Sequence, residues 1–237
     1  VLASSVGAHS MDDFPTWLDY QQEYFTPFLE RCGLSAETAE TVTELPEAFV
    51  NYAASVDVNR ILAAGDVVSV DGTDLTVDTV EGHAEGELTF AYEVDGDRRA
   101  LVGDNVLPEI TPNPFLQPPH EPGEDRPRVL PAFNRSLERL ADEPFDRFLP
   151  GHRGLVDDPP GRIGEIREAH EERTGDVADL VDGPTTPVEV MNDLFGDLPV
   201  TEQFAGLSEA VGHLDVLEDR DRVRREERGG VFVYEPV

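Results

Sequence analysis

Lysine is absent from this sequence. All 18 basic residues are arginine, and 50 aspartate and glutamate residues outnumber them, which gives a formal net charge of −32 at pH 7. A surface this negative repels phosphate backbones, so we expect no nucleic-acid partner. Because carboxylates hold water and cations, the composition is typical of proteins from halophiles, in which molar salt screens the self-repulsion of an acidic protein.

Cysteine and long apolar runs are also scarce. The one cysteine, Cys32, excludes an internal disulfide and any cysteine-rich zinc motif. It precedes Gly33, a plausible C-cap of a helix, so we interpret its thiol as a packing group. No apolar run is long enough to span a bilayer, so we expect no membrane partner. The sequence begins at Val1 without an export signal, and we expect a cytoplasmic protein whose true start lies upstream.

Hydrophobic residues make up 39% of the 237 positions, a globular composition that fits one large domain and one small one. Helical spacing of apolar residues predicts a helix over 12–31 and one or two more over 35–56. Two Asp-Gly turns inside alternating segments predict four short antiparallel strands over 66–103. A proline-rich loop over 108–131 follows, and loops this long are often functional.

The rest of the sequence is predicted to be mostly helical. We expect helices over 133–140 and 162–180, with a short strand over 145–149 between them. Later segments indicate two more helices, one opened by Thr186-Pro187, and a two-stranded ribbon with a Gly229-Gly230 turn. Helix, helix and ribbon are the pattern of a winged-helix domain. We therefore predict a first domain over 1–158, a helical linker over 159–185 and a winged-helix domain over 186–237.

Three short motifs stand where predicted strands end. They are Glu81-Gly82-His83-Ala84-Glu85-Gly86, Val102-Gly103-Asp104-Asn105 and Leu149-Pro150-Gly151-His152. Each motif is weak by itself, because a glycine with a histidine or an aspartate is common in turns. Their order and their positions at strand ends make the combination far more specific.

In this order the motifs resemble those of the metallo-β-lactamase superfamily. The segment from Gly103 to Asn113 is similar to the loop that follows the bridging aspartate in its glyoxalase-II-like branch, and His213-Leu214-Asp215-Val216-Leu217 is similar to its C-terminal winged-helix domain. The resemblance implies an α+β fold, a metallo-β-lactamase αβ/βα sandwich that is partial here because its first strands are missing, followed by a small winged-helix domain.

The resemblance also implies a zinc site. His83 would bind a first ion, His152 a second, and Asp104 would bridge them, since imidazole and carboxylate suit zinc. Two zinc ions would supply a metal-bound hydroxide near neutral pH and polarise an ester or thioester carbonyl of a small-molecule substrate. By their position after the bridging aspartate, Asn113 and Phe115 are candidate substrate-binding residues, and His120 is a third.

The sequence departs from the family in one respect, because it contains no His-x-His-x-Asp-His motif. The six histidines are His9, His83, His120, His152, His170 and His213. No catalytic residue is therefore identified, and two protein ligands for each zinc are too few for a stable site. Either the sequence is an N-terminally truncated hydrolase, which we favour, or it is a degenerate homologue. A truncated chain should expose apolar sheet surface and be poorly stable.

Three functions follow from this resemblance. The first is a zinc-dependent hydrolase with an incomplete site, the second is a non-catalytic interaction module on the same fold, and the third is a metal-dependent ribonuclease, which the net charge disfavours. The oligomeric state cannot be derived. Among the other histidines, we expect His9 in a solvated turn, His170 exposed on a polar helix, and His213 buried and hydrogen-bonded in the core.

Overall fold

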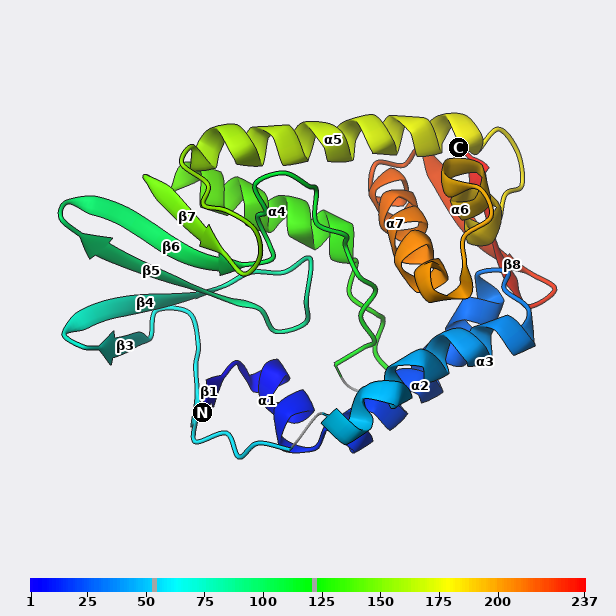
Figure 1. Cartoon of the computed structure of the whole chain (residues 1–237). Coiled ribbons are helices and arrows are strands. Elements are labelled where there is room, and N and C mark those ends of the chain that lie inside the picture. The colour runs from blue at the N-terminus through cyan, green and yellow to red at the C-terminus, as the bar shows by residue number, and fades with distance from the viewer. Residues whose placement is uncertain (53–54, 121–122) are drawn as a thin grey trace. The chain divides into compact units, whose positions relative to one another are not determined.

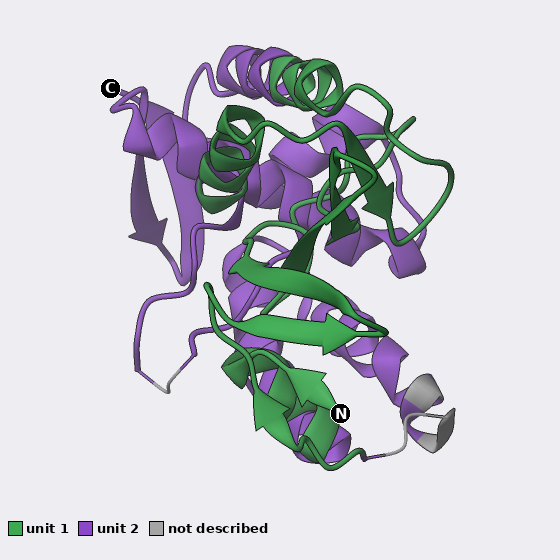
Figure 2. Cartoon of the chain, turned by 90° about the vertical axis from the view of Figure 1, so that its left-hand side faces the viewer, with its two compact units in different colours: residues 1–12, 56–114, 132–169 green, residues 13–55, 115–131, 170–237 purple. Residues whose placement is uncertain are grey.

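The computed structural model describes residues 1–52, 55–120 and 123–237. The chain forms two compact units, and each is built from segments that are distant in the sequence (Figure 2). Unit 1 comprises 1–12, 56–114 and 132–169, and unit 2 comprises 13–55, 115–131 and 170–237. This division differs from the predicted boundaries at 158 and 185. The helix predicted as a linker runs unbroken from one unit into the other, and residues 13–55 group with the C-terminal segment.

A five-stranded sheet organises unit 1 (Figure 1). Its strands are β3 (Val67–Val70), β4 (Thr73–Thr79), β5 (Leu88–Val94), β6 (Asp97–Gly103) and β7 (Arg147–Pro150), which neighbour one another in this order. The first four are antiparallel neighbours, as the sequence predicts, and β7 is parallel to β6. Because β6 and β7 are parallel, the residues that follow them emerge at the same edge of the sheet.

The two predicted hairpin turns are confirmed. Asp71 and Gly72 have φ values of 49° and 84°, and Asp95 and Gly96 have values of 54° and 85°. Positive φ at both central residues of a two-residue loop matches the right-handed twist of the flanking strands, which is why Asp-Gly predicts this connection well.

Both faces of this sheet carry buried residues. On one face Thr89, Ala100, Val102 and Phe148 are almost fully buried. On the other face Val77 is 1% exposed, whereas Leu101, in register with it through Phe90, is 39% exposed. At the edge, Val67 and Val70 on β3 are 45% and 51% exposed. The apolar sheet surface expected of a truncated chain stays a prediction.

Helix α4 (Val129–Asp142) contacts the end of β4 and the segment that follows it. Arg139 donates to the Asp78 carboxylate and to the Thr79 carbonyl at the end of β4, and the Ser136 hydroxyl accepts the amide of Glu81. Strand β7 and helix α5 (Pro159–Leu180) follow. These elements agree with the helices and the strand predicted over 133–180.

The first residues of the chain contain elements that the sequence did not indicate. Strand β1 (Leu2–Ala3) pairs in parallel with β2 (Arg60–Ile61), and helix α1 (Ser5–Asp12) follows β1. His9 is exposed but lies in α1, so its predicted turn is wrong. The short helix escapes prediction because its apolar periodicity is weak over eight residues.

Unit 2 begins with α2 (Phe14–Arg31), α3 (Ala36–Glu44) and the 3₁₀ helix η1 (Leu45–Tyr52). The Asp13 side chain caps α2 by accepting the Thr16 amide, and Cys32 at its other end is fully buried, as expected for a packing residue. Helix α3 gives way to η1 next to Pro46, within the segment predicted to hold one or two helices. Residues 53–54 of the predicted 35–56 segment, and 121–122 of the proline-rich loop, lie outside the described residues.

The C-terminal elements of unit 2 are α6 (Pro187–Phe195), α7 (Val200–Asp219), β8 (Val223–Arg228) and β9 (Val231–Pro236). Thr186 and Glu189 form a reciprocal capping box at the start of α6. Strands β8 and β9 form the predicted antiparallel ribbon. Aromatic residues of α2 contact these elements, since Phe25 packs on Phe204 and Phe28 on Phe232, so the segment 186–237 shares a core with α2.

Two buried polar groups stand out in unit 2. Arg126 forms a two-pronged ion pair with Asp215, at 2.8 and 2.7 Å, and their side chains are 8% and 1% exposed. His170, expected at the surface, is only 3% exposed. The prediction is wrong because His170 packs beside His213, with ring centroids 6.4 Å apart, a contact between distant helices that a polar local sequence does not reveal.

His213 is fully buried and hydrogen-bonded, as predicted. Its Nδ1 atom lies 2.8 Å from the Thr174 hydroxyl, and its Nε2 atom lies 3.3 Å from Glu209 Oε1. Among the helices that the structure describes, none is both long enough and apolar enough to cross a membrane.

Candidate metal centre

The three side chains predicted as metal ligands come together in unit 1. His83 lies in the connection between β4 and β5, Asp104 directly follows β6, and His152 follows β7. The Asp104 carboxylate is the common point, because both imidazole rings approach it. Ends of neighbouring strands hold all three residues, so the sheet itself sets their separation.

His83 presents one ring nitrogen to the aspartate and anchors the other. Its Nδ1 atom lies 3.1 Å from the carbonyl oxygen of Asn113, and its Nε2 atom lies 3.8 Å from Asp104 Oδ2. A carbonyl only accepts hydrogen bonds, so Nδ1 donates to it and Nε2 is the ring nitrogen that faces the carboxylate. This is the arrangement by which proteins orient a metal-binding histidine.

His152 contacts the aspartate directly. Its Nδ1 atom lies 2.8 Å from Asp104 Oδ1 and 2.7 Å from Oδ2, and its side chain is 73% exposed. Here the imidazole donates to the carboxylate. The His152 ring is therefore open to solvent, although the Asp104 side chain that it contacts is only 20% exposed. By contrast, His170 and His213 in unit 2 are buried.

Two glycines allow the backbone to bring Asp104 and His152 together. Gly103 has a φ of 54°, in the left-handed region that side chains disfavour. Gly151 donates its amide to the Gly103 carbonyl at 2.7 Å, and a Cβ atom at Gly151 would stand 2.8 Å from Asp104 Oδ1. The glycines of the two motifs therefore serve close approach between strand ends.

Glu87 and Asn105 support the aspartate from the other side. Glu87 Oε1 accepts the Asp104 amide at 3.1 Å, and Glu87 Oε2 accepts from the Asn105 side chain at 3.2 Å. Burial raises the pKa of Glu87, and the hydrogen bond from Asn105 and the nearby His83 oppose that shift. The sequence analysis missed both residues, although Glu87 directly follows the first motif and Asn105 ends the second.

The residue types fit a divalent metal, but the number of donors does not complete a site. Imidazole and carboxylate suit zinc, and the contact of His83 Nδ1 with a carbonyl leaves Nε2 as the nitrogen that faces Asp104. Over residues 1–52, 55–120 and 123–237, however, no group of three or more His, Cys, Asp or Glu side chains is arranged to hold a metal ion. Metal binding by His83, Asp104 and His152 stays a prediction.

The predicted substrate-binding residues are divided between the units. Asn113 belongs to unit 1, and its backbone carbonyl contacts His83. Phe115 and His120 belong to unit 2, where Phe115 stacks on Phe204 with ring centroids 6.4 Å apart and His120 is exposed. Their roles in substrate binding stay predictions.

Arg153 is a further residue beside the candidate ligands that the sequence analysis did not single out. It directly follows His152, has a φ of 69°, and donates to Glu109 Oε2 at 2.9 Å. A non-glycine residue in this backbone region is uncommon. The Gly-His-Arg-Gly sequence was the available signal, since glycines so close together mark a turn.

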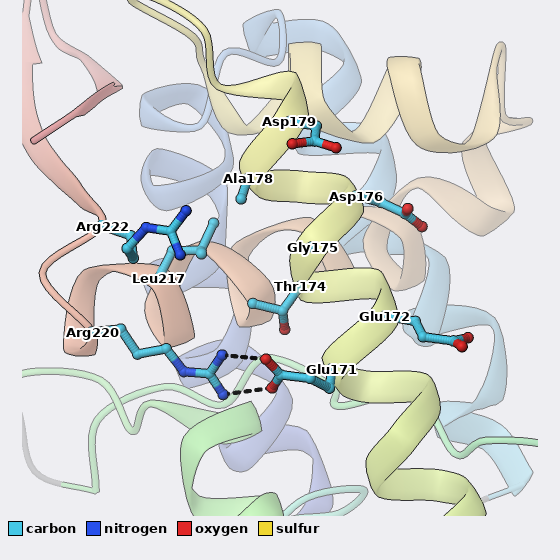
Figure 3. A pocket seen from close by; sticks show the side chains of 10 residues that line it. All are labelled: Glu171, Glu172, Thr174, Gly175, Asp176, Ala178, Asp179, Leu217, Arg220 and Arg222. Carbon is cyan, nitrogen blue, oxygen red and sulfur yellow. Dashed lines mark hydrogen bonds and ion pairs between the residues drawn. The ribbon is translucent and has the colours of Figure 1, made fainter.

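Two cavities, of about 510 and 600 Å³, lie in unit 2 and not around these ligands. Figure 3 shows the first, where Arg220 and Glu171 face each other in a two-pronged ion pair. The second contains the buried Arg126–Asp215 pair. In both cavities arginines are bonded to carboxylates of the same unit, and the candidate metal ligands line neither.

The chain is similar in sequence to a curated protein. It is 27% identical over 223 residues to the probable metallo-hydrolase YqjP of Bacillus subtilis, and the match covers 93% of this chain and 68% of that protein. No family model matches the chain.

Two solved structures share the fold. A metallo-β-lactamase family protein from Thermus thermophilus has a TM-score of 0.74 and 26% identity, with 100% of this chain and 71% of that chain covered. A β-lactamase domain protein from Burkholderia ambifaria has a TM-score of 0.80 and 23% identity, with 100% and 66% covered, and it shows the fold alone. The chain thus spans about two thirds of the length of the three relatives.

Proposed function

We propose that this chain, whose relatives support a place in the metallo-β-lactamase superfamily, is part of a zinc-dependent hydrolase of that superfamily. One observation carries the proposal. The Asp104 carboxylate lies between two imidazoles at neighbouring strand ends, 3.8 Å from His83 Nε2 and 2.7 Å from His152 Nδ1. A metallo-hydrolase relative and this donor set together favour a divalent metal, and we propose two zinc ions.

Each residue has a distinct role in this proposal. When bound, the metal would supply Lewis-acid chemistry that activates water and polarises an acyl carbonyl. His83 would offer Nε2 while the Asn113 carbonyl keeps the proton on Nδ1. His152 would serve the second ion, and Asp104 would be shared between the two. Gly103 and Gly151 let the backbone hold these donors at short range.

We further propose that the remaining ligands come from a His-x-His-x-Asp-His motif outside these 237 residues. Two observations support this. The described donors are too few for a stable zinc site, and the relatives are longer than the chain. The competing proposal is a degenerate, non-catalytic interaction module, which the incomplete donor set favours. A metal-dependent ribonuclease is disfavoured by the net charge of −32.

The proposed substrate is a small molecule with an ester or thioester bond, as in the glyoxalase-II-like branch. Asn113, Phe115 and His120 are its proposed contacts. We also propose that α6, α7 and the β8–β9 ribbon form a winged-helix arrangement, because their order is helix, helix and two-stranded ribbon.

The test uses the chain and, if the upstream reading frame encodes the motif, the longer protein. Metal analysis after dialysis in molar KCl should give about two zinc ions per longer protein. The His83→Ala and His152→Ala variants should each lose zinc, while the His120→Ala variant should retain it. Zinc-loaded protein should hydrolyse a thioester or ester, and metal retention without hydrolysis of either would favour the non-catalytic alternative.

A further inference from the structure

Glu87 contacts the Asp104 loop with both of its carboxylate oxygens. One carboxylate oxygen accepts the backbone amide of Asp104, and the other accepts the side chain of Asn105. The same Oε1 atom stands 2.5 Å from the place that a Cβ atom on Gly103 would occupy. The carboxylate is therefore fitted against three consecutive residues.

We propose that Glu87 and Asn105 are positioning residues that fix the Asp104 carboxylate between His83 and His152. The inference rests on the proposed function, in which Asp104 is a metal ligand. Carboxylates and carbonyls that orient the ligands of a metal site commonly decide its affinity.

The geometry of Asn105 supports this role. Its side chain is fully buried, and its Nδ2 atom lies 3.2 Å from Glu87 Oε2 and 3.4 Å from the Glu81 carbonyl oxygen. Both neighbours are acceptors, so the orientation of the amide group is determined. Asn105 thus links the residues on both sides of His83 to the loop that carries Asp104.

The cost of burial also argues for a specific role. A carboxylate in a partly desolvated position is unfavourable unless hydrogen bonds satisfy it, and an apolar residue there would avoid that cost. Glu87 accepts two hydrogen bonds from the Asp104 loop, and the Ala84 backbone amide donates a further one. From the other side, Gly151 donates to Gly103 at 2.7 Å. The aspartate is thus held between β5 and β7.

The test compares four proteins with the wild type. In the Glu87→Gln variant one oxygen becomes an amide that cannot accept from Asn105, and the Asn105→Asp variant instead places two carboxylates together. In the double variant E87Q/N105D the side-chain amide at position 87 can donate to the carboxylate at position 105, so the hydrogen bond is restored with its donor and acceptor exchanged. The matched control is Glu93→Gln, an exposed residue of β5, the strand that directly follows Glu87. Thermal unfolding confirms that each protein is folded.

Two readouts are measured in molar KCl. The first is hydrogen exchange of the Asp104 amide by NMR, which we expect to accelerate about tenfold or more in E87Q, as expected for weakening a charged hydrogen bond. The second is cobalt(II) affinity from visible absorption, which should fall about 10- to 100-fold in E87Q and N105D. The double variant should recover more than half of each loss on a logarithmic scale, and E93Q should match the wild type.

The two readouts separate the possible failures. Unchanged exchange and affinity in E87Q would overturn the inference, as would faster exchange without any loss of cobalt affinity. A double variant no better than its parents would also overturn it, because a general structural effect would not respond to reversed roles. Because the described donors are proposed to be only part of the site, cobalt(II) affinity is measured in the longer protein of the proposed function. If that protein binds no cobalt(II), the proposed function fails, and Asp104 exchange alone then decides whether Glu87 holds the loop.

Discussion

The two units use histidine in opposite ways. In unit 1, His152 is 73% exposed and bonds a carboxylate at a strand end, and His83 faces the same carboxylate. In unit 2, His170 and His213 are 3% and 0% exposed and pack against each other. Burial and the type of partner, rather than the residue itself, distinguish a candidate ligand from a core residue.

The buried ion pair of unit 2 should produce the largest loss of stability. The Asp215→Ala variant leaves Arg126 buried and without its carboxylate partner, which should lower the free energy of unfolding by about 3–5 kcal/mol. Denaturant unfolding in molar KCl measures this loss. The control is Asp219→Ala, which removes an exposed partner of Arg128 and should cost less than about 1 kcal/mol. Equal losses would show that Asp215 is solvated and that unit 2 lacks a buried pair.

Acid should destabilise unit 2 through His170. Burial, the neighbouring His213 and, in opposition, Glu209 set the pKa of His170, which is lowered to about 4. The folded state therefore disfavours the proton. The contribution of His170 to the free energy of unfolding is fully present above the unfolded pKa of about 6.5, and it is lost as the pH falls toward about 4.

Between pH 7 and pH 4.5 the wild type should lose about 2–3 kcal/mol more than a His170→Gln variant, because only the wild type carries this proton linkage. Urea unfolding at the two pH values gives the difference. The acidic surface titrates equally in both proteins and cancels. Parallel pH profiles would mean that His170 is accessible to water in the folded protein, which would remove the contrast with His152.

A smaller effect is expected at the site backbone. The Gly103→Ala substitution combines a positive φ with displacement of the Glu87 carboxylate, and should cost about 1–3 kcal/mol. The matched control is Gly65→Ala, where φ is 88° and no atom lies within 4 Å of the added Cβ. If thermal unfolding shows a larger loss of stability for Gly103→Ala than for Gly65→Ala, the difference measures the cost of displacing the Glu87 carboxylate. No excess would indicate that Glu87 moves aside freely.

The exposed Glu171–Arg220 pair should have the smallest effect. Its two contacts are 2.8 and 2.7 Å, but the side chains are 64% and 45% exposed. Glu171→Gln should therefore change the free energy of unfolding by less than about 1 kcal/mol, and molar salt should reduce that change further. A loss comparable with that of Asp215→Ala would show that short distance matters more than burial.

Local signals predicted most of the elements. The Asp71-Gly72 and Asp95-Gly96 turns require positive φ, which fixed the hairpins, and the Thr186 cap located α6. The glycine-containing motifs likewise located His83, Asp104 and His152, because strand ends that carry them converge in the resembled fold.

Long-range packing was not predictable from the same signals. Residues 13–55 join the C-terminal segment through contacts such as Phe25 with Phe204, which no local pattern encodes. The burial of His170 depends on a neighbour that is distant in the chain, His213. The role of Glu87 was not predictable for the same reason, since its partners Asp104 and Asn105 directly follow the end of β6.

The central claim is that His83, Asp104 and His152 form part of a divalent metal site and that the buried histidines do not. Manganese(II) added to the ¹⁵N-labelled chain in molar KCl tests it most directly, because the paramagnetic ion broadens nearby resonances. We predict broadening centred on residues 83, 104 and 152, absent around 170 and 213, and abolished in the Asp104→Asn variant. Broadening scattered over surface carboxylates, or unchanged in that variant, would contradict the claim.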